Sequence, residues 1–189
     1  MIVVLLKDII NMKLIIINII RSLFLHINLY NKVEADKSAI SQAVLVVIIS
    51  SVAAGVGTYH VGGVPGVLWG TVISLTGWVV MSLLIYVIGT KFFPESETRT
   101  DVLELMRTLG FASTPGILRF LILVPFIGPV ILLISWIWML VTMIVAVRQS
   151  LDFKNTWNAI WVCVVGLIAY WLVYIIILFY YGMPKPVWS

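Results

Sequence analysis

The sequence predicts an all-α polytopic membrane protein, a bundle of about five transmembrane helices preceded by an N-terminal interfacial amphipathic helix. Hydrophobic residues make up 62% of the chain and charged residues 11%, whereas soluble domains contain roughly 45–50% and 25%. Between Arg119 and Arg148 there is no Asp, Glu, Lys or Arg. In water such a stretch would need protein on every side, and 189 residues leave too little remaining protein to surround it. Lipid can surround it instead.

The distribution of charge and the scarcity of cysteine and histidine exclude several classes of function. The net charge of +4 is not gathered with aromatic residues on a soluble face, so we expect no nucleic-acid partner. Cys163 is the one cysteine, and His26 and His60 are the two histidines. A disulfide framework is excluded, and a metal site would need further ligands. We expect no cofactor, although a pigment or haem on His26 or His60 stays open.

Residues 1–33 carry polar side chains on one face of a helix. These are Lys7, Asn11, Asn18, Arg21, Ser22, His26 and Asn28. At about 100° per residue they cover an arc roughly 160° wide, with Ile, Leu, Val and Phe opposite. The pattern predicts a helix in the headgroup plane, distinct from a transmembrane domain over residues 34–189. A loosely attached tail or a poorly spanning helix is the alternative.

The first expected span covers residues 39–59. Ala39 to Thr58 contains no charged residue over 20 positions, which suffices for a bilayer core about 30 Å thick at 1.5 Å per residue. Asp36 and Ser38 precede the span, and either side chain could cap the helix.

The second expected span, residues 65–89, follows a short turn rich in Gly and Pro. Gly62, Gly66, Gly70 and Ser74 recur at every fourth position, so they form a smooth groove along one helix face. The groove could pack against another helix of this chain or contact a second protein. We expect packing within the chain.

Residues 91–113 form the only long polar segment after the first span. Thr98 followed by Asp101 fits a capping box, and two turns of amphipathic helix ending near Gly110 would follow. The acidic residues of the segment alternate with two arginines. Paired carboxylates can perform acid–base catalysis, but the segment lacks histidine and cysteine, so we expect a solvated, non-catalytic loop.

Two apolar runs, residues 114–127 and 129–148, flank a break at Gly128 and Pro129. The first run opens with Thr and Pro, which predict a helix start, because threonine can cap a helix and proline is tolerated at its first position. This run measures about 20 Å, which is short for a full crossing. We expect a helical hairpin with a thinned or tilted first arm. A re-entrant arm and a single kinked helix are the alternatives.

The last expected span covers residues 157–181. Either Asn155 or Thr156 could cap it. Aromatic residues flank the span at both ends, namely Trp157, Trp161, Tyr180 and Tyr181. Amphipathic aromatic side chains at both ends of a span are typical of the two membrane interfaces.

Basic residues predict the orientation. If residues 1–38 face the cytoplasm, that side holds eleven Lys and Arg residues and the far side holds one. They are Lys7, Lys13, Arg21, Lys32, Lys37, Lys91, Arg99, Arg107, Arg119, Arg148 and Lys154 against Lys185. Cytoplasmic loops carry the excess of Lys and Arg, so we expect five spans, a cytoplasmic N-terminus and an external C-terminus. Four spans would give ten against two, which is a weaker bias.

The expected spans contain few ionisable groups. Residues 39–90 hold only His60 and tyrosines, and residues 157–184 only Cys163 and tyrosines. Ion-coupled carriers and pumps usually need carboxylates or histidines at depth. Hydrolysis in the membrane needs a nucleophile with a base or a metal. We therefore expect that the protein is not an enzyme.

Three functions fit these features. The first is a non-catalytic membrane scaffold that binds partner proteins or shapes the bilayer. The second is an accessory subunit of a respiratory or photosynthetic membrane complex. The third, a small-solute channel or carrier, is favoured only by the helix break near Gly128 and Pro129. The expected partners are the lipid bilayer and either other membrane proteins or further copies of this chain.

Several short stretches resemble the prokaryotic branch of the Yip family (Ypt/Rab-interacting proteins, Yip-one domain). They include RTLGFASTPGILRFLILVPFIG and WMLVTMIVAVRQSLDFKNTWNAI, and the similarity covers about residues 34–175. The resemblance implies five membrane helices, a cytosolic N-terminal region and a prokaryotic plasma membrane. Eukaryotic members bind prenylated Rab GTPases, but their Asp-Leu-Tyr-Gly-Pro motif is absent here, so that role is not carried over.

The resemblance marks nine signature positions. They are Asp36, Gln42, Arg107, Gly110, Phe111, Pro115, Gly116, Arg148 and Asp152. We expect Arg107, Arg148 and Asp152 to pair at the cytoplasmic membrane face and to lock the hairpin to its neighbours.

Overall fold

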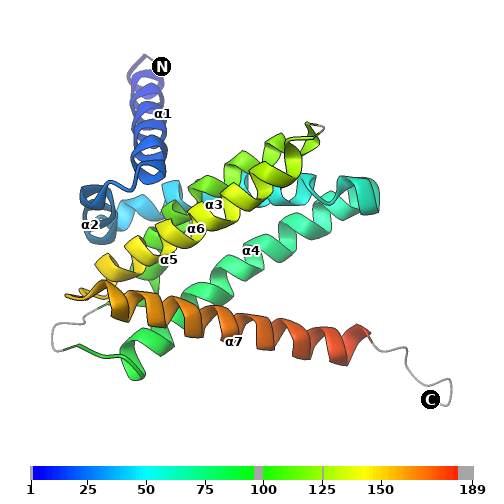
Figure 1. Cartoon of the computed structure of the whole chain (residues 1–189). Coiled ribbons are helices and arrows are strands. Elements are labelled where there is room, and N and C mark those ends of the chain that lie inside the picture. Colours follow the sequence, from blue (N-terminus) through cyan, green and yellow to red (C-terminus); the bar gives the residue numbers. More distant parts are fainter. Residues whose placement is uncertain (1, 96–99, 125, 183–189) are drawn as a thin grey trace.

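The computed structural model describes residues 2–95, 100–124 and 126–182, and every regular element in them is helical (Figure 1). The α-helices are α1 (Ile2–Leu23), α2 (Ile27–Ala35), α3 (Ile40–Val56), α4 (Tyr59–Lys91), α5 (Val102–Ala112), α6 (Gly128–Ser150) and α7 (Thr156–Gly182). Two 3₁₀-helices, η1 (Lys37–Ala39) and η2 (Thr114–Leu123), connect them. The all-helical prediction is confirmed for the described residues.

Four helical segments in the described residues are long and apolar enough to cross a membrane. They are Lys37–Val56, Gly62–Lys91, Gly128–Ser150 and Thr156–Ile177. Their positions match the first, second, fourth and fifth expected spans. In α4 the backbone of Gly63 leaves the helical region, with φ 56° and ψ −148°, a conformation that glycine adopts without steric cost. The predicted turn before the second span is therefore this kink.

The expected third span differs from the prediction. The described residues of the range 114–127 contain no α-helix; instead η2 is a ten-residue 3₁₀-helix that ends where Val124 becomes extended. At about 2.0 Å per residue it covers about 20 Å, and no candidate span includes it. The threonine does not cap it either, because the Thr114 hydroxyl donates to the Phe111 carbonyl at 2.5 Å. Proline does occupy the first turn, as expected.

η2 runs back along α6 in the opposite direction. The Ser135 hydroxyl donates to the Pro115 carbonyl (2.9 Å), and the Thr142 hydroxyl donates to the Ala112 carbonyl (2.7 Å). At the other end, Gly128 lies against the Ile122 carbonyl. Gly128, Ser135 and Thr142 of α6 thus contact Ile122, Pro115 and Ala112, in reverse chain order. The two elements therefore form a hairpin whose first arm is a 3₁₀-helix.

The loops gather at two ends of the bundle. At the first, called the α5 end, the Thr108 and Ser150 hydroxyls are 2.6 Å apart, and the Asn158 amide donates to Glu95 at 2.6 Å. At the second, called the far end, a side chain on Gly57 would contact Ile122. The turn from α3 to α4 and the turn from η2 to α6 thus lie together.

The hydrophobic core lies at the α5 end. Its largest fully buried side chains include Tyr30, Phe111, Leu29, Ile85, Leu105, Leu151, Val147 and Val162. They come from α2, α4, α5, α6, the turn after it and α7. Close packing of these side chains, together with hydrogen bonds between the elements, holds the helices together at this end. α2 is therefore part of the packed bundle.

The N-terminal segment forms two helices, whereas a single helix over residues 1–33 was expected. The chain breaks at Leu25, whose φ is 56°, and the break lets α2 turn into the core. The end of α1 is attached to the bundle, because the Ser22 hydroxyl donates to the Phe111 carbonyl (2.6 Å) and the Trp138 indole donates to the Leu23 carbonyl (2.8 Å). From there α1 projects away from the other helices (Figure 1).

Helix caps agree with the sequence patterns at some positions only. Asp36 caps η1 by accepting from the Ser38 amide at 2.9 Å, and Asn155 accepts from the Trp157 amide at 3.0 Å. The capping box of α5 is formed by Asp101 and Glu104, where Thr98 and Asp101 were expected. Thr98 lies outside the described residues. Glutamate at the third helical position reaches back to the cap amide, which places the helix start at Val102.

Candidate functional site

Several signature positions meet where α2, α3 and α5 pack together. Arg107 is 3% exposed; its Nε donates to the Val33 carbonyl (3.1 Å) and its Nη2 to the Glu34 carbonyl (2.5 Å). These carbonyls lie in the last turn of α2, where backbone acceptors lack helical partners and the helix dipole favours a cation. Arg107 thus joins α5 to the end of α2.

Two acidic groups beside Arg107 respond to this environment in opposite directions. Burial, with the negative charges of Asp152 and Glu104, raises the pKa of Glu34 to about 7, against the opposing effect of Arg107. Hydrogen bonds from Ser38 lower the pKa of Asp36. The Glu34 carboxyl group therefore changes charge near neutral pH.

Arg148 and Asp152 build the turn from α6 to α7. The Arg148 guanidinium donates to the carbonyls of Phe153 (3.4 Å) and Lys154 (3.5 Å). Asp152 has φ 51°, the left-handed conformation that often ends a helix. These contacts of Arg148 are local to its turn. Pairing among Arg107, Arg148 and Asp152 therefore stays a prediction.

The signature glycines lie at close helix approaches. A side chain on Gly110 would come within 2.8 Å of the Ala43 Cβ, and one on Gly116 would collide with the Ser50 hydroxyl. Both sites bring the segment from α5 to η2 against α3. The adjacent signature residue Gln42 accepts from the Asn18 amide at 3.0 Å, which ties α3 to α1.

The four-residue stripe on α4 faces several environments. Gly66 lies against Thr58, and a Cβ on Gly70 would lie 3.0 Å from the Gly55 Cα. Gly62 has open space around it, and Ser74 lines a cavity. The middle of the stripe therefore lies beside α3 of the same chain, and its role in holding the fold stays a prediction.

A cavity of about 410 Å³ lies beside η2 and is lined by α3, α4, α5, α6 and α7. Its lining residues are Val47, Ser50, Ser51, Ser74, Gly77, Trp78, Met81, Leu109, Ala112, Ser113, Arg119, Trp136, Ile137, Met139, Leu140, Met143, Leu167, Tyr170 and Trp171. The volume is that of a small-molecule or single-chain ligand site. Most of the wall is apolar, and Arg119 is the one charged residue among the described residues that line it.

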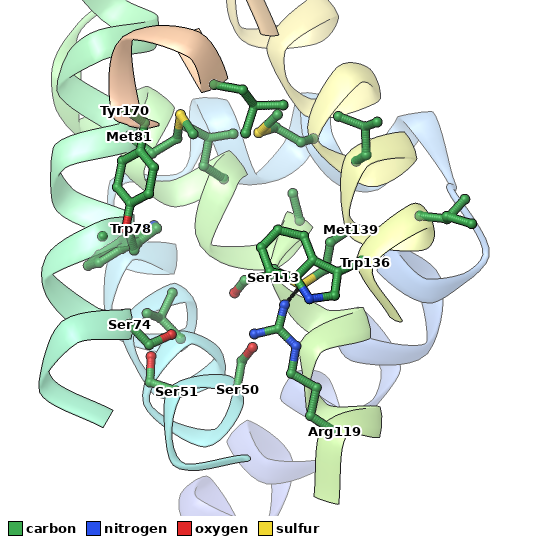
Figure 2. A pocket seen from close by; sticks show the side chains of 18 of the residues that line it. Ser50, Ser51, Ser74, Trp78, Met81, Ser113, Arg119, Trp136, Met139 and Tyr170 are labelled. Carbon is green, nitrogen blue, oxygen red and sulfur yellow. Dashed lines mark hydrogen bonds between the residues drawn. The ribbon is translucent and has the colours of Figure 1, made fainter. Parts of the chain in front are cut away.

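Arg119 reaches into this cavity from η2 (Figure 2). It is 9% exposed, its Cζ lies 5.1 Å from the centre of the Trp136 ring, and its Nη2 contacts the Met139 sulfur at 3.1 Å. The Arg119 Nε is buried without a hydrogen-bond partner. A ring face and a thioether attract the cation weakly, so the guanidinium keeps unused donor capacity.

Other polar groups share the cavity wall. The buried indole Nε1 of Trp78 also has no hydrogen-bond partner. Ser50, Ser51 and Ser74 also line the cavity (Figure 2). Buried donors without acceptors are rare in proteins and require an explanation. Two residues that line this cavity, Arg119 and Trp78, each carry one such donor.

The polar side chains of the cavity wall are hydrogen-bonding groups. Among the described residues that line the cavity, there are donors and hydroxyl groups but no Asp, Glu, His or Cys side chain. In the part of the chain that the structure describes, no three such side chains gather to hold a metal. General acid–base catalysis uses such titratable groups. The geometry instead suits an apolar ligand that carries a hydrogen-bond acceptor.

Sequence reasoning missed this site. Arg119 was counted among the cytoplasmic basic residues, yet it is buried in the cavity. One signal was available, because an arginine within an apolar run must find a partner or a polar cavity. Trp136, whose ring lies against Arg119, is 53% exposed.

Comparison with known proteins identifies the family. No curated protein and no solved structure matches the chain. The Yip1 domain matches residues 30–176, from α2 into α7, and leaves all of α1 outside. This match covers more than half of the chain and agrees with the four apolar helices. The protein is therefore an integral membrane protein that belongs to the Yip1 domain family.

Proposed function

We propose that this protein is a non-catalytic scaffold that organises its membrane and binds partner proteins through its cytoplasmic face and helix surfaces. The supporting observation is α1, which is attached at one end and projects from the bundle (Figure 1). Its outer surface exposes Met12 (62%), Ile16 (57%) and Ile20 (48%). Exposed apolar side chains on a helix bind a partner groove or a bilayer surface.

The same proposal includes a topology of five crossings in a prokaryotic plasma membrane, with η2 as the third. The positions of the loops support it. The α5 end holds α5 and the turn after α6, with Lys91, Arg107, Arg148 and Lys154, whereas the far end holds the turns after α3 and η2. Basic residues mark the cytoplasmic side, so the N-terminus would be cytoplasmic and the end of α7 external.

A pull-down from native membranes tests the scaffold function. The protein would be extracted in mild detergent, and the intact complex measured by mass spectrometry. The double variant Ile16→Glu and Ile20→Glu places charge on the exposed face of α1, while Lys13→Gln is a matched control on the same helix. We expect a stoichiometric protein partner that the double variant loses and the control retains.

Three other results would replace this proposal. A fixed place in a respiratory or photosynthetic complex, retained by the α1 variant, would favour the accessory subunit. Solute flux through liposomes that contain only this protein would favour the channel or carrier. A reporter after α7 that faced the cytoplasm would overturn the five-crossing topology.

A further inference from the structure

We propose that the cavity beside η2 binds a membrane lipid with an anionic headgroup, whose oxygen atoms accept hydrogen bonds from Arg119 and Trp78. Every ligand that fits this proposal carries an anionic oxygen group on an apolar chain. This ligand site is separate from the partner-binding surface of α1. Three observations support it: the donors, the charge and the exposed rim of the cavity.

The donors require an acceptor. The Arg119 Nε and the Trp78 Nε1 are both buried and lack a partner, and both residues line this cavity. Leaving such groups unsatisfied destabilises a folded protein. An oxyanion satisfies them, because a planar guanidinium matches carboxylate and phosphate oxygens.

The charge requires a counter-charge. Arg119 is 9% exposed, and the cavity wall contains no carboxylate. A buried cation is stable when an anion pairs with it. Since the lining residues provide none, the anion must come with the ligand.

The rim of the cavity is formed by lipid-facing side chains. Trp136 (53% exposed), Ile137 (54%) and Leu140 (38%) lie on α6, and Trp171 (51%) lies on α7. Both helices are candidate membrane spans, so their exposed apolar side chains face acyl chains. A lipid could enter between these helices, with its chain on this rim and its headgroup at Arg119.

Native mass spectrometry of the purified full chain tests the proposal. Phosphatidylglycerol, phosphatidylcholine and inorganic phosphate would be titrated separately against the wild type, Arg119→Gln and Arg21→Gln. Arg21 is an exposed residue of α1 outside the cavity, so its variant removes the same charge elsewhere. A charge-assisted hydrogen bond contributes about 1.5–3 kcal/mol, so Arg119→Gln should weaken phosphatidylglycerol binding at least about tenfold.

The remaining arms separate the sources of the anion. We expect one molecule of phosphatidylglycerol to bind per protein, more tightly than phosphatidylcholine does. Arg21→Gln should change the affinity for phosphatidylglycerol by less than about twofold. Trp78→Phe keeps an aromatic ring but removes the indole donor, so it should also weaken phosphatidylglycerol binding. This variant keeps the proposal testable if Arg119→Gln fails to fold. Equal binding of both lipids, unchanged binding by the Arg119 and Trp78 variants, or tight binding of inorganic phosphate alone would overturn the proposal.

Discussion

Two buried arginines, one at the α5 end and one in the cavity, have different hydrogen-bond partners. Arg107, at the α5 end, donates to two backbone carbonyls of α2. Arg119, in the cavity, contacts a thioether and an indole ring, and its Nε has no acceptor. Since a buried donor gains stability only from an acceptor, the first arginine stabilises the fold and the second is available to a ligand.

The surroundings of the two residues follow the same division. The α5 end contains the fully buried core, including Tyr30, Leu105 and Leu151, and its polar groups bond to one another. The cavity lies between helices whose outer surfaces are largely exposed. We infer that the α5 end carries most of the stability, whereas the cavity part carries the binding chemistry.

The largest effect should come from removing Arg107. Arg107→Ala leaves the Val33 and Glu34 carbonyls without their donor and opens a gap between α2 and α5. We expect the free energy of unfolding to fall by about 3 kcal/mol, since each buried unsatisfied group costs about 1–3 kcal/mol. Titration with SDS, followed by circular dichroism, measures the change.

Arg21→Ala is the matched control for that substitution. It removes an exposed arginine from α1 and should change stability by less than about 0.5 kcal/mol. If both variants unfolded at the same SDS concentration as the wild type, Arg107 would have no structural role.

The second effect concerns the packing of α5 on α3. In Gly110→Ala the new methyl group would come within 2.8 Å of the Ala43 Cβ and 3.3 Å of its backbone. Overpacking of this kind costs about 1–3 kcal/mol. Gly62→Ala meets nothing within 4 Å and should be neutral or slightly stabilising. Thermal unfolding in detergent compares the two, and equal melting temperatures would contradict close packing at Gly110.

Much of the fold could be predicted because the strongest signals are local. Charge-free runs set the α3, α4, α6 and α7 spans, and Gly128 with Pro129 marks the start of α6. The 3₁₀ winding of η2 was not predicted, because no local sequence signal separates it from an α-helix; its Pro115 carbonyl accepts from Ser135 of α6, a contact distant in the chain. The break at Leu25 also follows from tertiary packing, because it directs α2 into the core.

The candidate site was harder to predict because its residues are far apart in the chain. Arg119 and Trp78 are separated by 41 positions, from 119 − 78, and they line one cavity only after α3 to α7 have packed around it. The signature positions were found by resemblance, yet Gly110 and Gly116 lie at close helix contacts. Sequence patterns report local geometry well, whereas a cavity is formed by several elements together.

The third effect tests whether the α5 end contains an unfavourable charge. The pKa of Glu34 is raised to about 7 from an ordinary value of 4.5, so the folded state binds more protons than the unfolded state between these pH values. The contribution of Glu34 to stability is therefore fully present below pH 4.5 and is lost as the pH rises through about 7. Because water partly screens Glu34, we expect a loss of about 1–2 kcal/mol.

Glu34→Gln isolates this contribution. The neutral amide should make the variant more stable than the wild type at pH 8 and should flatten the stability profile between pH 5 and pH 8. Denaturant titrations at several pH values measure both slopes. The same downward slope in Glu34→Gln would assign the pH dependence to another group.

The smallest effect should have the opposite sign to that of Arg107. Arg119→Met replaces a buried, incompletely bonded cation with an apolar side chain of similar length, and such replacements are often neutral or stabilising. In detergent without anionic lipid we expect the variant to be as stable as the wild type, or up to about 1 kcal/mol more stable. Added phosphatidylglycerol should then stabilise only the wild type, because a ligand stabilises the state that binds it. Destabilisation of Arg119→Met by as much as Arg107→Ala, with or without lipid, would show that both arginines hold the fold and would end the distinction between the two parts.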